Sequence, residues 1–193
     1  MGVLFGSFSV NASGLDIALS NETANFAVLL NPPYHFSDGG GSELAFGGFV
    51  SEQGDRLGHI SLIARGYRYS NGTSYSLGTG MKAIAGDIAI AELVDEPEPE
   101  EAVGAVALGF QFGVLLASSQ HNPIELALEA FHAPSITSFS DAERYTEFGG
   151  RLQIDVIPQA RAYIGYRRMR FDTDDHKNVP LDRSIHIGVK LTF

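Results

Sequence analysis

Apolar and polar residues alternate with a period of two through most of the chain from residue 43 onward. The clearest run is the last one, residues 184–193, where every second residue is apolar as far as Phe193. Residues 143–156 repeat the pattern, with Leu152 and Ile154 on one face and Arg151 and Gln153 on the other. Side chains of a strand point alternately to its two faces, and no helical period is sustained. The pattern therefore predicts an all-β protein with eight strands in this region.

The most apolar stretch, residues 102–117, has to be assigned to either a helix or a strand. As a helix it would be roughly 24 Å long, which is shorter than the bilayer core of about 30 Å. Val106, Leu108, Phe110 and Val114 alternate there with small residues. The alternation favours a strand.

Three further segments refine the number and the phase of the strands. Residues 14–36 contain a predicted hairpin around Asn21-Glu22-Thr23, which gives ten strands; eight remain if that pair packs inside or beneath the others. Residues 74–91 change their apolar phase between Met81 and Ile88, which predicts a β-bulge. In residues 160–171 we expect Tyr163 and Arg167 on the polar face.

Long and short connections interleave along the chain. Residues 51–57, 92–102, 133–142 and 172–181 are long and polar, whereas 70–73, 118–122 and 157–159 are short. An up-and-down membrane barrel has long loops at one rim and tight turns at the other. The order therefore predicts an up-and-down antiparallel transmembrane β-barrel of ten strands, with eight as the alternative.

Alternation alone leaves open which face meets the outside of the barrel, because a soluble barrel buries its apolar face and a membrane barrel exposes it. The loop asymmetry and the aromatic residues near strand ends (Tyr67, Tyr69, Tyr75, Phe131, Tyr145, Phe171) favour the membrane arrangement. A soluble, lipocalin-like ligand-binding barrel is the alternative. In the membrane arrangement, the residues predicted to line the lumen are Arg65, Lys82, Glu125, Glu129, Glu147, Arg151, Asp155, Arg161, Arg167, His186 and Lys190.

These lumen residues could do one of two things. Opposite charges such as Glu147 and Asp155 near Arg151 would form a paired network that fills the interior, since eight or ten strands leave little space. Alternatively, the same side chains would line a narrow conduit for small polar or ionic solutes.

Charge and composition exclude several classes of function. The 193-residue chain has a net charge of −10, so nucleic acid is not an expected partner, because phosphate binding needs clustered Lys and Arg. It has no cysteine, and its six histidines show no metal-ligand spacing, so we expect neither a metal nor a cofactor. Six carboxylates within residues 92–101 lack the spacing of a calcium loop and indicate a solvated loop.

One set of residues could support chemistry. His132 lies near Ser135, Ser138, Ser140 and Asp141, the groups that a lipid-acting barrel hydrolase would need. No nucleophile elbow accompanies them. We expect that the protein is not an enzyme and keep the hydrolase as the less favoured alternative.

The first twelve residues, MGVLFGSFSVNA, are apolar and end in a small-x-small pattern, as at a signal-peptidase site. We interpret residues 1–12 as the remnant of a signal peptide and 13–193 as the barrel. A first strand is the alternative, because no basic residue precedes Arg56.

The arrangement of the strands resembles that of a known family. The stretch YTEFGGRLQIDVIPQARAYIGYRR at 145–168 and the terminal IHIGVKLTF resemble the YfaZ family of bacterial outer-membrane proteins. The resemblance covers roughly residues 14–193 and implies a small, porin-like barrel in the outer membrane of a Gram-negative cell, with no catalytic residues. It also implies contacts with outer-membrane lipid, lipopolysaccharide and the barrel-assembly machinery, and Phe193 resembles the carboxyl-terminal assembly signal of such barrels.

Overall fold

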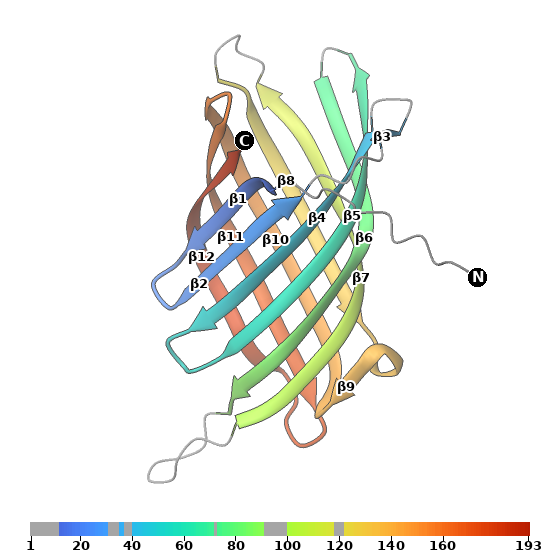
Figure 1. The fold of residues 1–193 in the computed structure, drawn as a ribbon, viewed down its shortest axis with the longest axis vertical. Coiled ribbons are helices and arrows are strands. Elements are labelled where there is room, and N and C mark those ends of the chain that lie inside the picture. The colour runs from blue at the N-terminus through green and yellow to red at the C-terminus, as the bar shows by residue number, and fades with distance from the viewer. Residues whose placement is uncertain (1–11, 31–34, 37–39, 72, 91–99, 118–121) are drawn as a thin grey trace, which may run out of the picture.

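The chain folds into a closed antiparallel barrel of ten strands (Figure 1). The structure, a computed structural model, describes residues 12–30, 35–36, 40–71, 73–90, 100–117 and 122–193. The wall strands are β1 (Ala12–Leu19), β2 (Thr23–Leu30), β4 (Gly40–Ser51), β5 (Arg56–Ser70), β6 (Thr73–Ala89), β7 (Glu100–Ala117), β8 (Ile124–Ala133), β10 (Ala142–Ile157), β11 (Ala160–Thr173) and β12 (Val179–Thr192). Two short strands lie outside this ring: β3 (His35–Phe36) pairs with β4, and β9 (Ser138–Ser140) with β7.

The hairpin of β1 and β2 closes the barrel. β1 pairs with β12, where Ile17 lies opposite Val189, and β2 pairs with β4, where Val28 lies opposite Phe46. Every neighbour in the ring is antiparallel. The predicted ten strands are confirmed, and so is the strand assignment of residues 102–117, which lie in β7.

The connections separate into two rims, as the spacing of loops predicted. β4, β6, β8 and β11 end, and β5, β7, β10 and β12 begin, at the lower end in Figure 1, called here the long-loop rim. β5, β7, β10 and β12 end at the upper end, the short-turn rim. The signal-peptide interpretation of residues 1–12 falls almost entirely outside the described residues.

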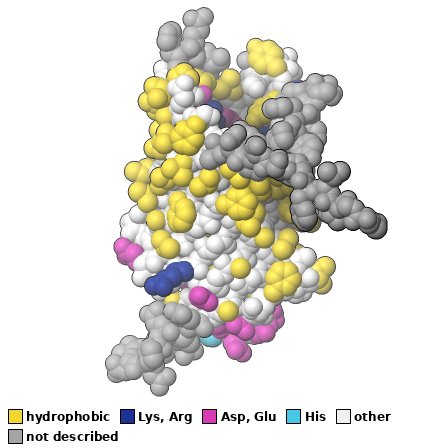
Figure 2. All heavy atoms as spheres, viewed as in Figure 1, with side chains coloured by type: hydrophobic (Ala, Val, Ile, Leu, Met, Phe, Trp, Pro, Cys, Tyr) yellow, Lys and Arg dark blue, Asp and Glu magenta, His cyan; other side chains and the backbone are white. Residues whose placement is uncertain are grey.

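Apolar side chains cover the outer wall and polar ones point to the axis. On β12, Ile185 and Ile187 are 66% and 64% exposed, whereas Ser184 and His186, which alternate with them, are buried. Figure 2 shows hydrophobic side chains spread over the wall, while Asp and Glu gather toward the lower end. A water-soluble barrel would have the reverse arrangement, so the fold is that of a transmembrane barrel.

The described residues contain one short 3₁₀ turn, Ser135–Thr137. No helix in this part of the chain is long and apolar enough to cross a membrane.

The prediction of a β-bulge in residues 74–91 is wrong. β6 keeps continuous register with both of its neighbours from Tyr75 to Asp87. Its apolar phase changes because Met81 faces outward, at 49% exposed, whereas Ile84 and Ile88 face inward and are buried. The interior itself changes from polar to apolar along the axis, and the alternation of the backbone is not interrupted.

Three of the six aromatic residues near strand ends are buried in the interior. Phe131, Tyr145 and Phe171 are at most 4% exposed, whereas Tyr69 is exposed near the short-turn rim. Tyr145 points inward because it is two residues from Glu147 on the same strand and therefore shares its face.

Candidate functional site: the barrel interior

The interior has two halves of different chemistry. A cavity of about 240 Å³ occupies the half toward the short-turn rim, and a second, of about 180 Å³, adjoins it at that rim. They share Tyr67, Glu125 and Arg161 in their linings. The half toward the long-loop rim is filled by apolar side chains.

The structure places all eleven side chains predicted to line the lumen on the inner face of the wall. The main cavity is lined by Arg65, Lys82, Glu125, Glu129, Glu147, Arg151, Arg161, Arg167, His186 and Lys190. Asp155 lines the smaller cavity at the rim.

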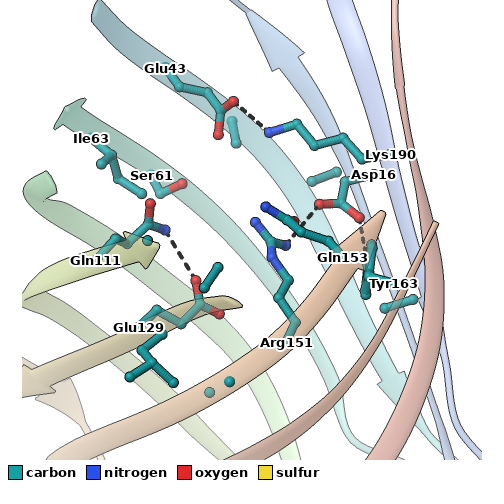
Figure 3. A pocket seen from close by; sticks show the side chains of 18 of the residues that line it. Asp16, Glu43, Ser61, Ile63, Gln111, Glu129, Arg151, Gln153, Tyr163 and Lys190 are labelled. Atoms are coloured by element: carbon teal, nitrogen blue, oxygen red, sulfur yellow. Dashed lines mark hydrogen bonds and ion pairs between the residues drawn. The ribbon is translucent and has the colours of Figure 1, made fainter. Parts of the chain in front are cut away.

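Arg151 on β10 binds a carboxylate on the strand that closes the barrel. Its Nη1 lies 3.4 Å from Oδ2 of Asp16 on β1, and the hydroxyl of Tyr163 on β11 donates to Oδ1 of the same carboxylate at 2.5 Å. The guanidinium also lies over the Tyr163 ring, 5.3 Å from its centroid. Figure 3 shows these groups converging on Asp16. Arg151 and Tyr163 therefore tie β10 and β11 to β1.

The glycine opposite Tyr163 makes room for this ring. Gly188 on β12 pairs with Tyr163, and a Cβ at that position would lie 2.2 Å from the ring carbon Cζ. The ring leans across the backbone of β12 to reach Asp16 on the next strand, which only glycine permits.

Three further hydrogen bonds lie along the wall of the main cavity. Lys190 Nζ on β12 donates to Glu43 Oε2 on β4 at 2.7 Å. Gln111 on β7 donates to Glu129 Oε2 on β8 at 3.1 Å, and its carbonyl accepts a hydrogen bond from Arg65 on β5 (Figure 3). Gln111 thus links a cation and an anion that do not touch.

Closer to the rim, Arg161 on β11 bridges two carboxylates. It pairs with Asp155 on β10, and its Nη1 lies 3.3 Å from Glu125 Oε2 on β8. These three side chains are 27–35% exposed, more than the ion pairs deeper in the barrel.

At the bottom of the cavity the ion pairs are buried. Lys82 Nζ on β6 lies 2.6 Å from Glu147 Oε2 on β10, and the hydroxyl of Tyr145 donates to the same oxygen at 2.7 Å. Arg167 Nη2 on β11 lies 2.6 Å from Asp182 Oδ2 on β12. Removing one member of such a pair would leave a buried charge without compensation, which is strongly destabilising.

Below these pairs, an apolar core crosses the barrel. It consists of Phe49, Leu57, Ile63, Ile84, Ile88, Ile90, Val103, Ala105, Ala107, Phe131, Ala133, Ala142, Tyr145, Met169, Phe171 and Leu181, each at most 6% exposed. The core draws on eight of the ten wall strands, all except β1 and β2. The rings of Tyr145 and Phe171 lie 4.9 Å apart at its centre. On the β2 side Thr23 is buried and donates to Asp182 at 3.4 Å.

Charges lining the two cavities are balanced. Six carboxylates (Asp16, Glu43, Glu125, Glu129, Glu147, Asp155) face six cations (Arg65, Lys82, Arg151, Arg161, Arg167, Lys190). The cavity therefore has no strong preference for one sign of solute charge.

The sequence pattern predicts that these charged residues lie on the inner face, but it does not identify their ion-pair partners. The expected contact of Arg151 with Glu147 and Asp155 is wrong, because residues four apart on one strand point the same way without meeting across the barrel. Asp16 and Glu43 were missed, although Asp16 lies between the apolar residues Leu15 and Ile17 and Glu43 directly precedes Leu44. Asp182 was missed because it precedes the alternating run of residues 184–193 from which the last strand is predicted.

The residues of the alternative hydrolase are not assembled. His132 Nδ1 lies 3.2 Å from Thr146 Oγ1, and Ser138 Oγ donates to the Pro134 carbonyl at 3.1 Å. Within the described residues no group of three or more His, Asp or Glu side chains could hold a metal ion.

The sequence matches the model of one protein family. The family model described as YfaZ precursor matches residues 1–193, the whole chain. No curated protein matches the chain.

Solved structures with similar folds are bacterial barrels at low identity. A bacterial polysaccharide outer membrane secretin is 10% identical with a TM-score of 0.48, over 89% of this chain and 57% of the other. This chain thus spans little more than half of the secretin. The beta domain of the Bordetella autotransporter BrkA is 12% identical with a TM-score of 0.47, over 94% and 99% of the two chains. The NanC porin is 12% identical with a TM-score of 0.42, over 94% and 100%.

Proposed function

The chain belongs to the YfaZ precursor family, and we propose that it is an integral outer-membrane barrel whose interior is closed to solutes at the long-loop rim. In this proposal the protein is a structural component of the membrane. The charged half of the lumen is a blind cup that opens at the short-turn rim.

Two features support insertion in a bilayer. The outward side chains include Leu108 and Phe110 on β7 and Ile164 on β11, each more than half exposed. Closure of the ring by β1 and β2 pairs the strand edges, as a hydrocarbon environment requires. The even strand number and the unequal rims are those of bacterial outer-membrane barrels, so the long-loop rim would face the cell exterior.

The observation that carries the closure is the apolar core. Its sixteen residues are at most 6% exposed and, apart from Ile63 and Phe131, which line the cup, they lie between the cup and the long-loop rim. A barrel of this size has an interior that side chains can fill, whereas open channels are typical of about sixteen strands or more. An ion in transit would have to cross this layer of apolar side chains, which is strongly unfavourable.

Solute flux tests this proposal directly. Vesicles containing the purified protein and an impermeant osmolyte would be diluted into isotonic arabinose, glycine or sodium chloride. We expect swelling no faster than that of protein-free vesicles, because the apolar core blocks the lumen. Swelling that increases with the amount of protein would contradict the closure, and flotation of the same vesicles verifies that the protein has inserted.

Assembly would depend on the carboxyl terminus. Phe193 is 79% exposed at the short-turn rim, and its backbone N–H donates to the Ser13 carbonyl at 3.0 Å. The ring is therefore not part of the packed interior, and its loss should cost the folded barrel little stability. Phe193→Ser is expected to lower the amount of folded barrel in outer-membrane fractions without changing the stability of the protein refolded in detergent.

A narrow porin is the second candidate, favoured by the balanced charges of the cup. It would need the core around Tyr145 and Phe171 to open. The swelling experiment separates the two functions.

A further inference from the structure

Arginines occupy the outer wall of β10, β11 and β12 just beyond the apolar surface. On β11 and β12 the outward rungs pair Ile164 with Ile187, then Tyr166 with Ile185, and then Arg168 with Arg183. Successive outward rungs are two residues apart, or roughly 6.6 Å. The wall therefore changes from fully apolar to doubly cationic in a single step toward the long-loop rim.

Arg168 and Arg183 both point away from the lumen. The residues on either side of them, Arg167 and Met169 on β11 and Asp182 and Ser184 on β12, are all buried in the interior. Both arginines are exposed. Two like charges directly opposite each other on neighbouring strands repel, so this arrangement needs a compensating anion.

The protein supplies no such anion to this pair among the residues that the structure describes. Neither Arg168 nor Arg183 has a side-chain hydrogen bond or ion pair there. The neighbouring arginines do have partners: Arg170 Nη1 donates to Asn178 at 2.8 Å, and Arg144 lies 3.3 Å from Asp172. The pair is therefore an unneutralised cationic site beside two arginines, Arg144 and Arg170, that are bound.

The surroundings of the pair are those of a lipid at its headgroup. Phe148 on β10 pairs with Arg168 and is 50% exposed, and Tyr166 and Ile185 lie one rung deeper in the apolar surface. Acyl chains would contact these apolar side chains, while a headgroup would lie beside the guanidinium groups. On its far side, Arg183 lies beyond the end of β1, whose last pair joins Leu19 to Ile187.

We propose that Arg168 and Arg183 bind the phosphate groups of a phosphorylated lipid in the leaflet at the long-loop rim. Arginine is suited to this ligand because its planar fork donates two parallel hydrogen bonds to phosphate oxygens. The site rests on the proposed membrane placement of the barrel, in which that leaflet is the outer one and contains phosphorylated glycolipid. It uses none of the lumen residues.

Binding of lipid A to the detergent-solubilised barrel tests the proposal, with lipid A carrying two phosphates as the probe and dephosphorylated lipid A as its control. Native mass spectrometry gives the fraction bound at each lipid concentration. The variant R168A/R183A is expected to bind lipid A at least about tenfold more weakly than the wild type, because charge-assisted hydrogen bonds to phosphate are lost. R68A, which removes an exposed arginine near the short-turn rim, is the matched control and should bind as the wild type does.

Three results would overturn the proposal. They are equal affinity of R168A/R183A and wild type, equal affinity of the wild type for both lipids, and displacement of lipid A by millimolar inorganic phosphate, which would indicate a site for free anions. Circular dichroism verifies folding of each variant, and R168K/R183K, which keeps the charge, should bind with intermediate affinity. Because the assay is done in detergent, failure of vesicle insertion would refute the membrane placement without affecting this result.

Discussion

The two halves of the interior are built on the same strands and with the same alternation, yet they differ in what fills them. Toward the short-turn rim, inward positions hold charged side chains such as Arg151 and Glu129 around a cavity. Toward the long-loop rim, the inward positions of the same β10 and β11 hold Tyr145 and Phe171, which pack without space between them. The barrel fold therefore determines which residues point inward. The local sequence determines whether those residues line the cup or form the apolar core, called here the plug.

A substitution at the boundary between the two halves should lower the free energy of unfolding most. Glu147→Ala would leave Lys82 buried without a counterion and Tyr145 without an acceptor, at an expected cost toward the upper end of ~3–5 kcal/mol. Urea unfolding in detergent micelles measures this free energy. Glu125→Ala at the rim is the matched control and should cost below about 1 kcal/mol, since Arg161 retains Asp155. Equal costs would contradict the buried boundary.

Next in size is the loss of a ring from the apolar core. Phe171→Ala is expected to destabilise the barrel by ~3–5 kcal/mol, toward the lower end because the Tyr145 ring can move partly into the space. The same unfolding measurement applies. Ile185→Ala, on the outer wall, should cost less because detergent or lipid chains fill the space that it leaves. A larger effect at Ile185 would mean that the assignment of inner and outer faces is incorrect.

A substitution in the cup should lower the free energy of unfolding less than Glu147→Ala or Phe171→Ala does. Arg151→Ala would remove one partner of Asp16, but the Tyr163 hydroxyl still donates to that carboxylate, so we expect a loss of ~1–3 kcal/mol. Solute flux should remain at the background level, because the plug is elsewhere. Increased swelling of Arg151→Ala vesicles would show instead that the charged network is what closes the lumen.

The smallest effect is expected at the long-loop rim itself. Lys177 pairs with Glu143, and both side chains are about half exposed. Lys177→Ala should change the free energy of unfolding by less than about 1 kcal/mol, and the difference should shrink as salt is added. A salt-independent loss of several kcal/mol would be inconsistent with a solvated pair.

Most of the wall could be predicted from sequence because alternation and loop length are local signals. The phase of residues 143–156 and 184–193 and the hairpin of residues 14–36 follow from them. The plug could also have been predicted, since Tyr145 shares the parity of Glu147, and Ile84 and Ile88 that of Lys82. We instead use Tyr145 only as an aromatic residue near a strand end, and we interpret the change of phase before Ile88 as a bulge.

The ion-pair partners could not be predicted from sequence in the same way. Arg151 and Asp16 are 135 residues apart and meet because β1 closes the ring near β12, so their contact depends on strand number, tilt and stagger together. Lys82 and Glu147 face each other across the lumen for the same reason. Single-strand patterns contain no information on these contacts.

Single-channel recording in planar bilayers tests the closed lumen most directly when the wild type is compared with the double variant Tyr145→Ala/Phe171→Ala. The account predicts no current above that of the bare membrane for the wild type, and discrete openings once the two rings at the centre of the plug are removed. Discrete channels of the wild-type protein, with conductance unchanged in the double variant, would contradict it.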